Sequence, residues 1–188
     1  GTVAFVATLA FAPHVEIGIL AGLFLSLPLL IYRSMTPRVA LLGRHPDGTW
    51  RDAERFGLAP AHPQLSILRF DGPLHFVNAA TFEDAVLAVE RDHPQLKVLL
   101  ISSAGINDID ASGIDTLRRL HRQLAAGGRR LACCGLKKQV IDVLERTGLW
   151  AELGPHAAYR HEDDALGGLL PLLGVAPSAA APRRGLEW

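Results

Sequence analysis

A polar, glycine-containing stretch at residues 102–113 holds the residue types best suited to do chemistry. It has the sequence Ser-Ser-Ala-Gly-Ile-Asn-Asp-Ile-Asp-Ala-Ser-Gly and joins an apolar segment to a helical pattern. In an open α/β sheet, sites gather beyond the carboxyl ends of the strands. Asp110 is placed to cap the helix by accepting from the amide of Ser112 or Gly113. Ser112 then lies in the first turn, where a phosphate would meet free N–H groups and the positive helix end.

Ser112 admits two interpretations. A small, accessible hydroxyl followed by glycine suits reversible phosphorylation, which would add negative charge at the start of the helix. Alternatively, the segment is a well-capped helix start whose serine is never modified, and the residue types alone favour this second interpretation. We predict Ser112 as a regulatory position, with Asp110 and Gly113 as its supporting loop, and leave its modification open.

Enzymatic and nucleic-acid functions find no support in the sequence. A nucleophile elbow has glycine two positions before and after its serine, whereas Asp110 and Ile114 occupy those positions around Ser112. The Gly-Gly-Arg-Arg sequence at 127–130 lacks the Gly-Lys-Ser/Thr ending of a phosphate-binding loop. Basic and acidic residues are equal in number, at 19 each, so there is no electrostatic basis for a nucleic-acid partner. We predict no catalytic residues and no enzyme.

Residue types that bind metals occur near the C-terminus, but their arrangement argues against a site. His156 and His161 precede three consecutive acids at 162–164, which is typical of a solvated helix start. The two cysteines, Cys133 and Cys134, are adjacent. In a strand their side chains would point to opposite faces and pair poorly as a disulfide. We expect two buried thiols, no metal and no cofactor.

Alternating strand and helix patterns surround the loop at 102–113. Residues 97–101 predict a buried parallel strand, and 110–126 predict a helix with an apolar stripe of Ile114, Leu117, Leu120 and Leu124. The other predicted strands are 38–43, 65–70, 74–77 and 130–134, and the other helices are 78–92 (capped by Asn78), 137–147 and 162–173. This alternation predicts an α/β fold with a mixed or parallel sheet and packed helices.

The N-terminal part has a different character. Residues 16–32 form an almost uncharged apolar run, and Arg33, Arg38 and Arg44 follow it. As a helix the run would extend about 25 Å, which is close to the roughly 30 Å thickness of a hydrocarbon core and marginal for spanning it. Tyr32 at the interfacial level and the arginines after it favour a membrane helix over the alternative, a buried core helix or hairpin. The same arginines place the following domain on the cytoplasmic side.

These patterns predict four segments, and we expect the native chain to begin upstream of Gly1. The segments are membrane residues 2–32 (a short helix end at 2–11 and the last membrane helix at 16–32), a linker with the first strand at 33–64, a folded domain at 65–174 and a disordered tail at 175–188.

Three groups of residues resemble a known family. Residues 110–113, Asp-Ala-Ser-Gly, follow a Val-Leu-Leu-Ile strand and resemble the STAS domain, which anti-sigma factor antagonists share with the cytoplasmic tails of SulP sulfate permeases. Residues 69–79, RFDGPLHFVNA, are more similar to the permease branch. So are residues 16–19, Glu-Ile-Gly-Ile, leading into a last transmembrane helix and then Tyr-Arg-Ser at 32–34. The resemblance covers about residues 2–173.

The resemblance implies the C-terminal portion of a secondary anion transporter that carries sulfate, bicarbonate or dicarboxylates. It implies a cell (inner) membrane protein, multi-pass in its full form, whose cytoplasmic STAS domain serves regulation and dimer assembly. The implied partners are the lipid membrane, a second copy contacted through the membrane helix and the STAS domain, and a regulatory protein or nucleotide at loop 102–113. The family's anion site lies between earlier membrane helices, so we expect no substrate-binding residue here.

The antagonist branch gives the alternative function. In its members, the serine that matches Ser112 is phosphorylated by an anti-sigma kinase. The alternative is therefore a stand-alone STAS switch of the anti-anti-sigma or stressosome type, which binds a kinase according to the phosphorylation of Ser112. The apolar run at 16–32 discriminates between the two functions, because a soluble switch has no use for a lipid-compatible segment.

Overall fold

A computed structural model describes residues 15–35 and 37–175 of the chain. The chain divides into two compact units, Gly1–Pro37 and Arg38–Trp188. The predicted helix end at 2–11 and nearly all of the predicted disordered tail lie outside the described residues.

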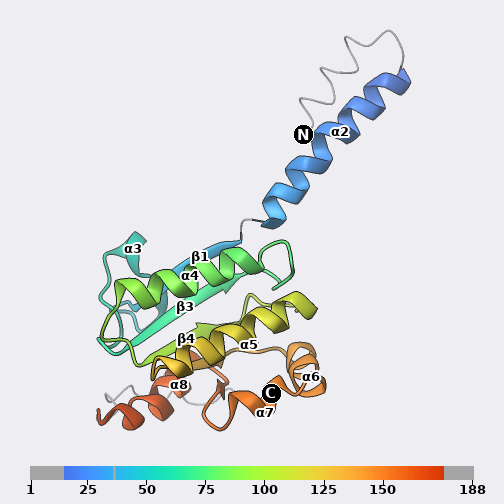
Figure 1. Cartoon of the computed structure of the whole chain (residues 1–188). Coiled ribbons are helices and arrows are strands. Elements are labelled where there is room, and N and C mark those ends of the chain that lie inside the picture. Colours follow the sequence, from blue (N-terminus) through green and yellow to red (C-terminus); the bar gives the residue numbers. More distant parts are fainter. Residues whose placement is uncertain (1–14, 36, 176–188) are drawn as a thin grey trace, which may run out of the picture. The chain divides into compact units, whose positions relative to one another are not determined.

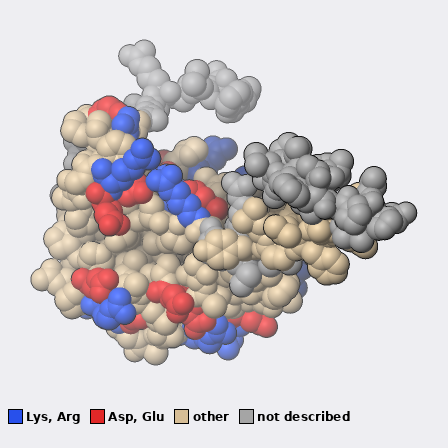
Figure 2. Space-filling model, turned by 90° about the horizontal axis from the view of Figure 1, so that it is seen from above, with Lys and Arg blue, Asp and Glu red and all other residues tan. Residues whose placement is uncertain are grey.

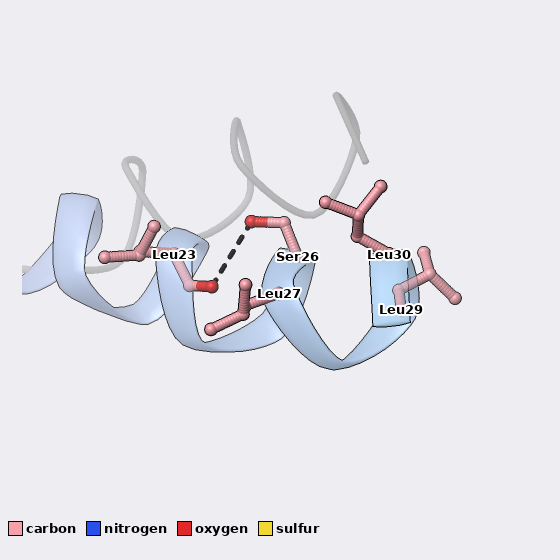
Figure 3. A pocket seen from close by; sticks show the side chains of 5 residues that line it. All are labelled: Leu23, Ser26, Leu27, Leu29 and Leu30. Carbon is pink, nitrogen blue, oxygen red and sulfur yellow. Dashed lines mark hydrogen bonds between the residues drawn. The ribbon is translucent and has the colours of Figure 1, made fainter. Parts of the chain in front are cut away.

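The first unit contains one described helix, α2 (Val15–Met35), which holds Pro28 in its interior. A proline there lacks the amide that would bond to the preceding turn and so weakens the helix locally. A groove of about 340 Å³ runs along α2 and is lined by Leu23, Ser26, Leu27, Leu29 and Leu30. The Ser26 hydroxyl lies 3.4 Å from the Leu23 carbonyl oxygen, to which it donates (Figure 3). Within residues 15–35 and 37–175, no helix has the length and apolar character needed to cross a membrane.

The second unit is built on a mixed sheet (Figure 1). Its strands in the described part of the chain are β1 (Arg38–Arg44), β2 (Trp50–Asp52), β3 (Leu65–Asp71), β4 (Val98–Ser102), β5 (Arg130–Cys134) and β6 (Ala158–Tyr159), in the order β2-β1-β3-β4-β5-β6. The strand β1 is antiparallel to both β2 and β3, whereas β3, β4, β5 and β6 run parallel. The parallel strands therefore all end at one edge of the sheet.

Helices cover both faces of this sheet. One face packs against α4 (Ala79–Asp92), α5 (Ala111–Ala126), α6 (Lys138–Arg146) and α7 (Leu149–Leu153). The other face packs against α8 (Glu162–Leu169) and the short 3-10 helix η1 (Pro171–Leu173). A further short helix, α3 (Ala53–Phe56), follows β2. The predicted α/β class with packed helices is confirmed.

The two cysteines show how the strands divide the core. Cys133 belongs to the cluster under α4–α7, and Cys134 belongs to the cluster under α8. Both are free and buried. Adjacent strand residues thus contribute to opposite layers, as period-2 alternation requires. The stripe of α5 is buried as well, which confirms the helical spacing of Ile114, Leu117 and its neighbours.

Some sequence-based expectations for local structure were wrong. No strand forms at 74–77; Leu74 makes a single bridge to Ile109, and a turn follows it. The turn is closed by Asn78, whose side chain accepts from the His75 amide at 3.0 Å and donates to the Pro73 carbonyl at 2.8 Å. Asn78 precedes α4 as predicted, but its side chain does not cap the helix.

Four short elements were not predicted from the sequence. β2 and α3 occupy part of the expected connector, while α7 and β6 fill the segment between α6 and α8. Their lengths of two to five residues leave too little periodicity for a pattern to reveal.

Candidate functional site

The loop at 102–113 lies at the edge of the sheet where the parallel strands end, between β4 and α5. Its first residues are anchored on the neighbouring strands. The amide of Ser103 donates to the carbonyl of Cys134 at 2.8 Å. Gly105 lies so close to the end of β3 that a Cβ there would be 2.6 Å from the Phe70 carbonyl oxygen. The backbone approach therefore requires glycine, and the loop is held firmly against β3 and β5.

Asp110 is the N-cap of α5, as predicted from the sequence. Its Oδ1 accepts from the Gly113 amide at 2.8 Å, and its Oδ2 accepts from the Phe76 amide at 2.9 Å. Its own amide donates to the Leu74 carbonyl at 3.2 Å. One side chain thus closes the helix end and ties it to the turn after Leu74.

These contacts lower the pKa of Asp110. Partial burial acts in the opposite direction and is the largest single influence, but the amides of Gly113 and Phe76, the nearby His75 and the Ser112 amide together outweigh it. The carboxylate form is therefore the one that the fold stabilises.

Gly113 is required by packing. A Cβ at this position would be 2.3 Å from the Leu74 carbonyl oxygen and 2.8 Å from Ile109. Separations this short are not tolerated without backbone movement, so the first turn of α5 can lie against the Leu74 backbone only with glycine there. The structure brings Asp110 and Gly113 together in one hydrogen bond.

Ser112 is exposed in the first turn of α5. Its hydroxyl makes no hydrogen bond to any of the described residues, so it is accessible to solvent and to an incoming protein. Exposed acids at Asp108 and Asp115 flank the turn in sequence. A phosphate on Ser112 would therefore add negative charge next to the Asp110 carboxylate rather than to an arginine cluster.

Contacts from outside the loop complete the site, and the sequence patterns did not predict that they reach this loop. Lys137, at the N-cap of α6, donates through Nζ to the side-chain oxygen of Asn107. Gln139 donates to the Asn107 carbonyl at 2.5 Å. His75 lies 3.3 Å from an Asp108 oxygen. The start of α6 follows β5 at the same edge of the sheet, and this topological rule was the signal that could have indicated Lys137 and Gln139.

Behind the loop, Ser102 anchors α8. Its hydroxyl, on a side chain that is almost fully buried, donates to Glu162 Oε1 at 2.6 Å. Glu162 is thus engaged by the end of β4. Among the residues that the structure describes, no group of three or more His, Cys, Asp or Glu side chains is placed to hold a metal ion.

The site combines an exposed hydroxyl with an exposed aromatic ring. The serine lies at the start of α5, and the ring is that of Phe76, in the turn before α4. Among the described residues, the serine makes no hydrogen bond to a base. On the face shown in Figure 2, Lys and Arg side chains adjoin Asp and Glu side chains, without a large area of one sign. This face therefore lacks the large basic patch that is typical of a nucleic-acid-binding surface.

Comparison with known proteins identifies the fold. A family model for the STAS domain matches residues 58–165, more than half of the chain. The chain is 27% identical over 176 residues to "Probable sulfate transporter 4.2" of Arabidopsis thaliana. The alignment covers 88% of this chain and 26% of that protein. The chain spans about a quarter of the length of the curated relatives it matches.

Solved structures agree with this match. The murine Slc26a9 anion transporter in its inward-facing state superimposes with a TM-score of 0.74 at 18% identity, over 87% of this chain and 27% of that one. A sulfate transporter family protein from Wolinella succinogenes gives a TM-score of 0.55 at 21% identity, over 66% of this chain and all of that one. The site at 102–113 thus lies in a chain that belongs to the STAS domain family and has sulfate transporters of the SulP/SLC26 type as relatives.

Proposed function

We propose that the chain is the C-terminal portion of a SulP-type secondary anion transporter, which carries sulfate, bicarbonate or dicarboxylates. One observation carries the proposal. The alignment with a plant sulfate transporter covers 88% of the chain, so it extends well beyond the STAS match at residues 58–165. Similarity outside the STAS domain is expected if this chain comes from a transporter. It is not expected if the chain shares only the STAS domain with transporters.

The N-terminal unit is proposed to lie in the lipid bilayer, as one part of a multi-pass membrane region. Eight large apolar side chains between Ile19 and Leu30 of α2 are each at least 52% exposed. An exposed apolar surface of this extent needs an apolar environment, which lipid and neighbouring membrane helices supply. Arg33 and Arg38 follow in the sequence and favour a cytoplasmic position for the second unit.

The STAS domain is proposed to regulate transport and to promote assembly of a dimer. It would do so by contacting the membrane region more favourably in one of the inward- and outward-facing states than in the other. The loop at 102–113 is the proposed contact for a regulatory protein or nucleotide, because Ser112 is exposed there and Phe76 is exposed in the adjoining turn before α4. Transport itself would be carried out by residues outside this chain.

A kinase-regulated STAS switch is the second candidate, and exposure of Ser112 in the first turn of α5 is the observation that favours it. A solved structure of a putative anti-sigma factor antagonist from Thermotoga maritima has a TM-score of 0.50 at 16% identity, which concerns the fold alone. The apolar side chains of α2 argue against this candidate, because a soluble switch would expose them to water.

Uptake of labelled sulfate by the complete protein tests the proposal. The coding sequence is extended upstream of Gly1, and the purified product is reconstituted into liposomes. We expect uptake that unlabelled sulfate, bicarbonate or a dicarboxylate suppresses, and reduced uptake when residues 38–188 are removed. A complete protein that lacks further apolar spans, or that takes up none of these anions, would contradict the transporter assignment.

A further inference from the structure

A second candidate site lies at the edge of the sheet opposite to the loop at 102–113. There, where β4 and β5 begin, a pocket of about 410 Å³ opens between the strand ends and η1. Its volume falls within the range of small-molecule sites. The lining residues that matter for its chemistry are Gln64, Lys97, Arg129, Arg130, Leu172 and Leu173.

The charge of this pocket is unbalanced. Three of its lining residues are cations and none is an acid. Arg129 is neutralised by an ion pair with Glu90. Lys97 and Arg130 form no ion pair with any residue of the described ranges. The chain as a whole carries as many acids as bases, so two uncompensated cations in one hollow are a local feature and not a consequence of composition.

The sheet holds the backbones of these two residues close together. The amide of Arg130 donates to the carbonyl of Lys97 at 2.8 Å, and the amide of Lys97 donates to the carbonyl of Gln64 at 2.9 Å. The backbones of Lys97 and Arg130 are therefore on neighbouring strands, about 5 Å apart. The turn before Arg130 needs Gly128, whose φ is +69°. Both residues line the same pocket, and two cations that line one hollow suit an anion with several oxygen acceptors, such as a phosphate.

The opposite side of the pocket is apolar. Leu172 and Leu173 of η1 line it, and Leu172 is 48% exposed although most large apolar side chains of the second unit are buried. An inorganic ion would leave this surface in water, whereas a phosphate ester with a small apolar group would cover it. The pocket thus combines a cationic side with an apolar side.

We infer that the pocket between Lys97, Arg130 and Leu172 binds a phosphate monoester that bears a small apolar group. Such a phosphate ester has two sources, a soluble metabolite or a lipid headgroup, and both present the same chemistry to the pocket. The site is separate from the loop at 102–113 and does not depend on the transporter assignment, since all its residues belong to the second unit.

Calorimetric titration of the 188-residue chain in a nonionic detergent tests the inference. Three ligands are compared. Phenyl phosphate carries both the charge and the apolar group, inorganic phosphate carries the charge alone, and benzyl alcohol carries the apolar group alone. We expect phenyl phosphate to bind most tightly and benzyl alcohol not to bind. Dihexanoyl phosphatidic acid, titrated in parallel, represents the lipid source, and the tighter of the two esters identifies the source.

Substitutions assign the binding to this pocket. Replacing both cations, Lys97→Gln with Arg130→Gln, should weaken the affinity for phenyl phosphate roughly tenfold. Leu172→Ala should weaken phenyl phosphate but leave inorganic phosphate unchanged. The matched control is Arg91→Gln with Lys138→Gln, which removes the same charge from side chains that are 75% and 77% exposed elsewhere. It should leave the affinity within twofold.

The inference is overturned if the pocket variant and the control bind phenyl phosphate equally, or if no phosphate ester binds to the unaltered chain at millimolar concentration. Thermal unfolding of each variant verifies that it is folded. Should the double variant fail to fold, Lys97→Gln alone is used, because Lys97 is exposed and precedes β4. It should then show a weakening of about threefold, and an unchanged affinity would reject the site.

Discussion

The backbone amide of Phe76 donates a hydrogen bond of 2.9 Å to the carboxylate of Asp110, 34 residues further along the chain. The other oxygen of that carboxylate caps α5 through Gly113. A single side chain therefore connects the turn before α4 with the start of α5. Because Ser112 lies within the capped turn, its position depends on the same carboxylate.

Asp110→Ala should destabilise the domain by about 1–3 kcal/mol, since it removes the helix cap and leaves the Phe76 amide without its acceptor. Urea unfolding of the chain in mild detergent measures this change. Asp115→Ala is the matched control, because Asp115 is exposed and forms a surface ion pair with Arg118 across one helical turn. Its effect should stay below about 0.5 kcal/mol. Equal effects of the two substitutions would show that Asp110 does not connect these elements.

The pH dependence of that stability provides the second readout for Asp110. The pKa of its carboxyl is lowered from the ordinary 3.8, so the stabilisation is fully present above pH 3.8 and is lost as the pH falls toward the lower folded value. The difference in unfolding free energy between the native chain and Asp110→Ala should therefore shrink as the solution is made more acidic. A difference that is constant below pH 3.8 would contradict the assigned ionisation.

Gly113→Ala should cost roughly 2–3 kcal/mol, because the added methyl group would overlap the Leu74 carbonyl. Gly167→Ala is the control. Gly167 lies within α8, is exposed, and has open space where a Cβ would be placed. There the substitution should stabilise the domain by up to about 1 kcal/mol. Opposite signs from the same chemical change would establish the close backbone contact, and a neutral Gly113→Ala would disprove it.

Ser112→Asp should weaken self-association or partner binding more than Ser112→Ala does, because it places a charge beside the Asp110 carboxylate, as a phosphate would. Sedimentation equilibrium in detergent measures the self-association. Unfolding should be nearly unchanged in Ser112→Ala, since the hydroxyl has no partner among the described residues. Association that weakens equally in both variants would favour the interpretation of Ser112 as part of a capped helix start and no more.

Cys133 and Cys134 should be unreactive toward a thiol reagent in the folded protein and react once it is unfolded. Burial raises the pKa of the Cys133 thiol to about 12. Burial, and then the negative charge of Glu162, also raise the pKa of Cys134. Since the fold holds neutral thiols, stability should be lost as the pH rises above 9.0, the ordinary value. Rapid labelling of the native chain at pH 8 would contradict this.

The elements that were predicted from the sequence are those whose hydrophobic pattern extends over many residues. The stripe of α5 and its cap at Asp110 follow from local rules, because the helix spacing and the capping side chain are both encoded within a few residues. The opposite placement of Cys133 and Cys134 follows from the alternation of a strand. These features do not depend on distant parts of the chain.

The features that local patterns missed depend on tertiary contacts. Residues 74–77 have strand-like composition, but the amides of His75 and Phe76 are taken by the side chains of Asn78 and Asp110. Asn78 occupies a cap position while its side chain serves the preceding turn. The pairing of Lys137 with Asn107 joins residues that are 30 positions apart, and no short-range pattern predicts such a contact.

The account depends most on the apolar N-terminal unit residing in lipid while the STAS domain remains a separate folded body. Size-exclusion chromatography without detergent, applied to the 188-residue chain and to residues 38–188, tests this directly. We predict that the full chain aggregates unless detergent is added, whereas residues 38–188 elute as a discrete species that unfolds cooperatively. A full chain that is monodisperse in water, or a truncated chain that does not fold, would contradict the account.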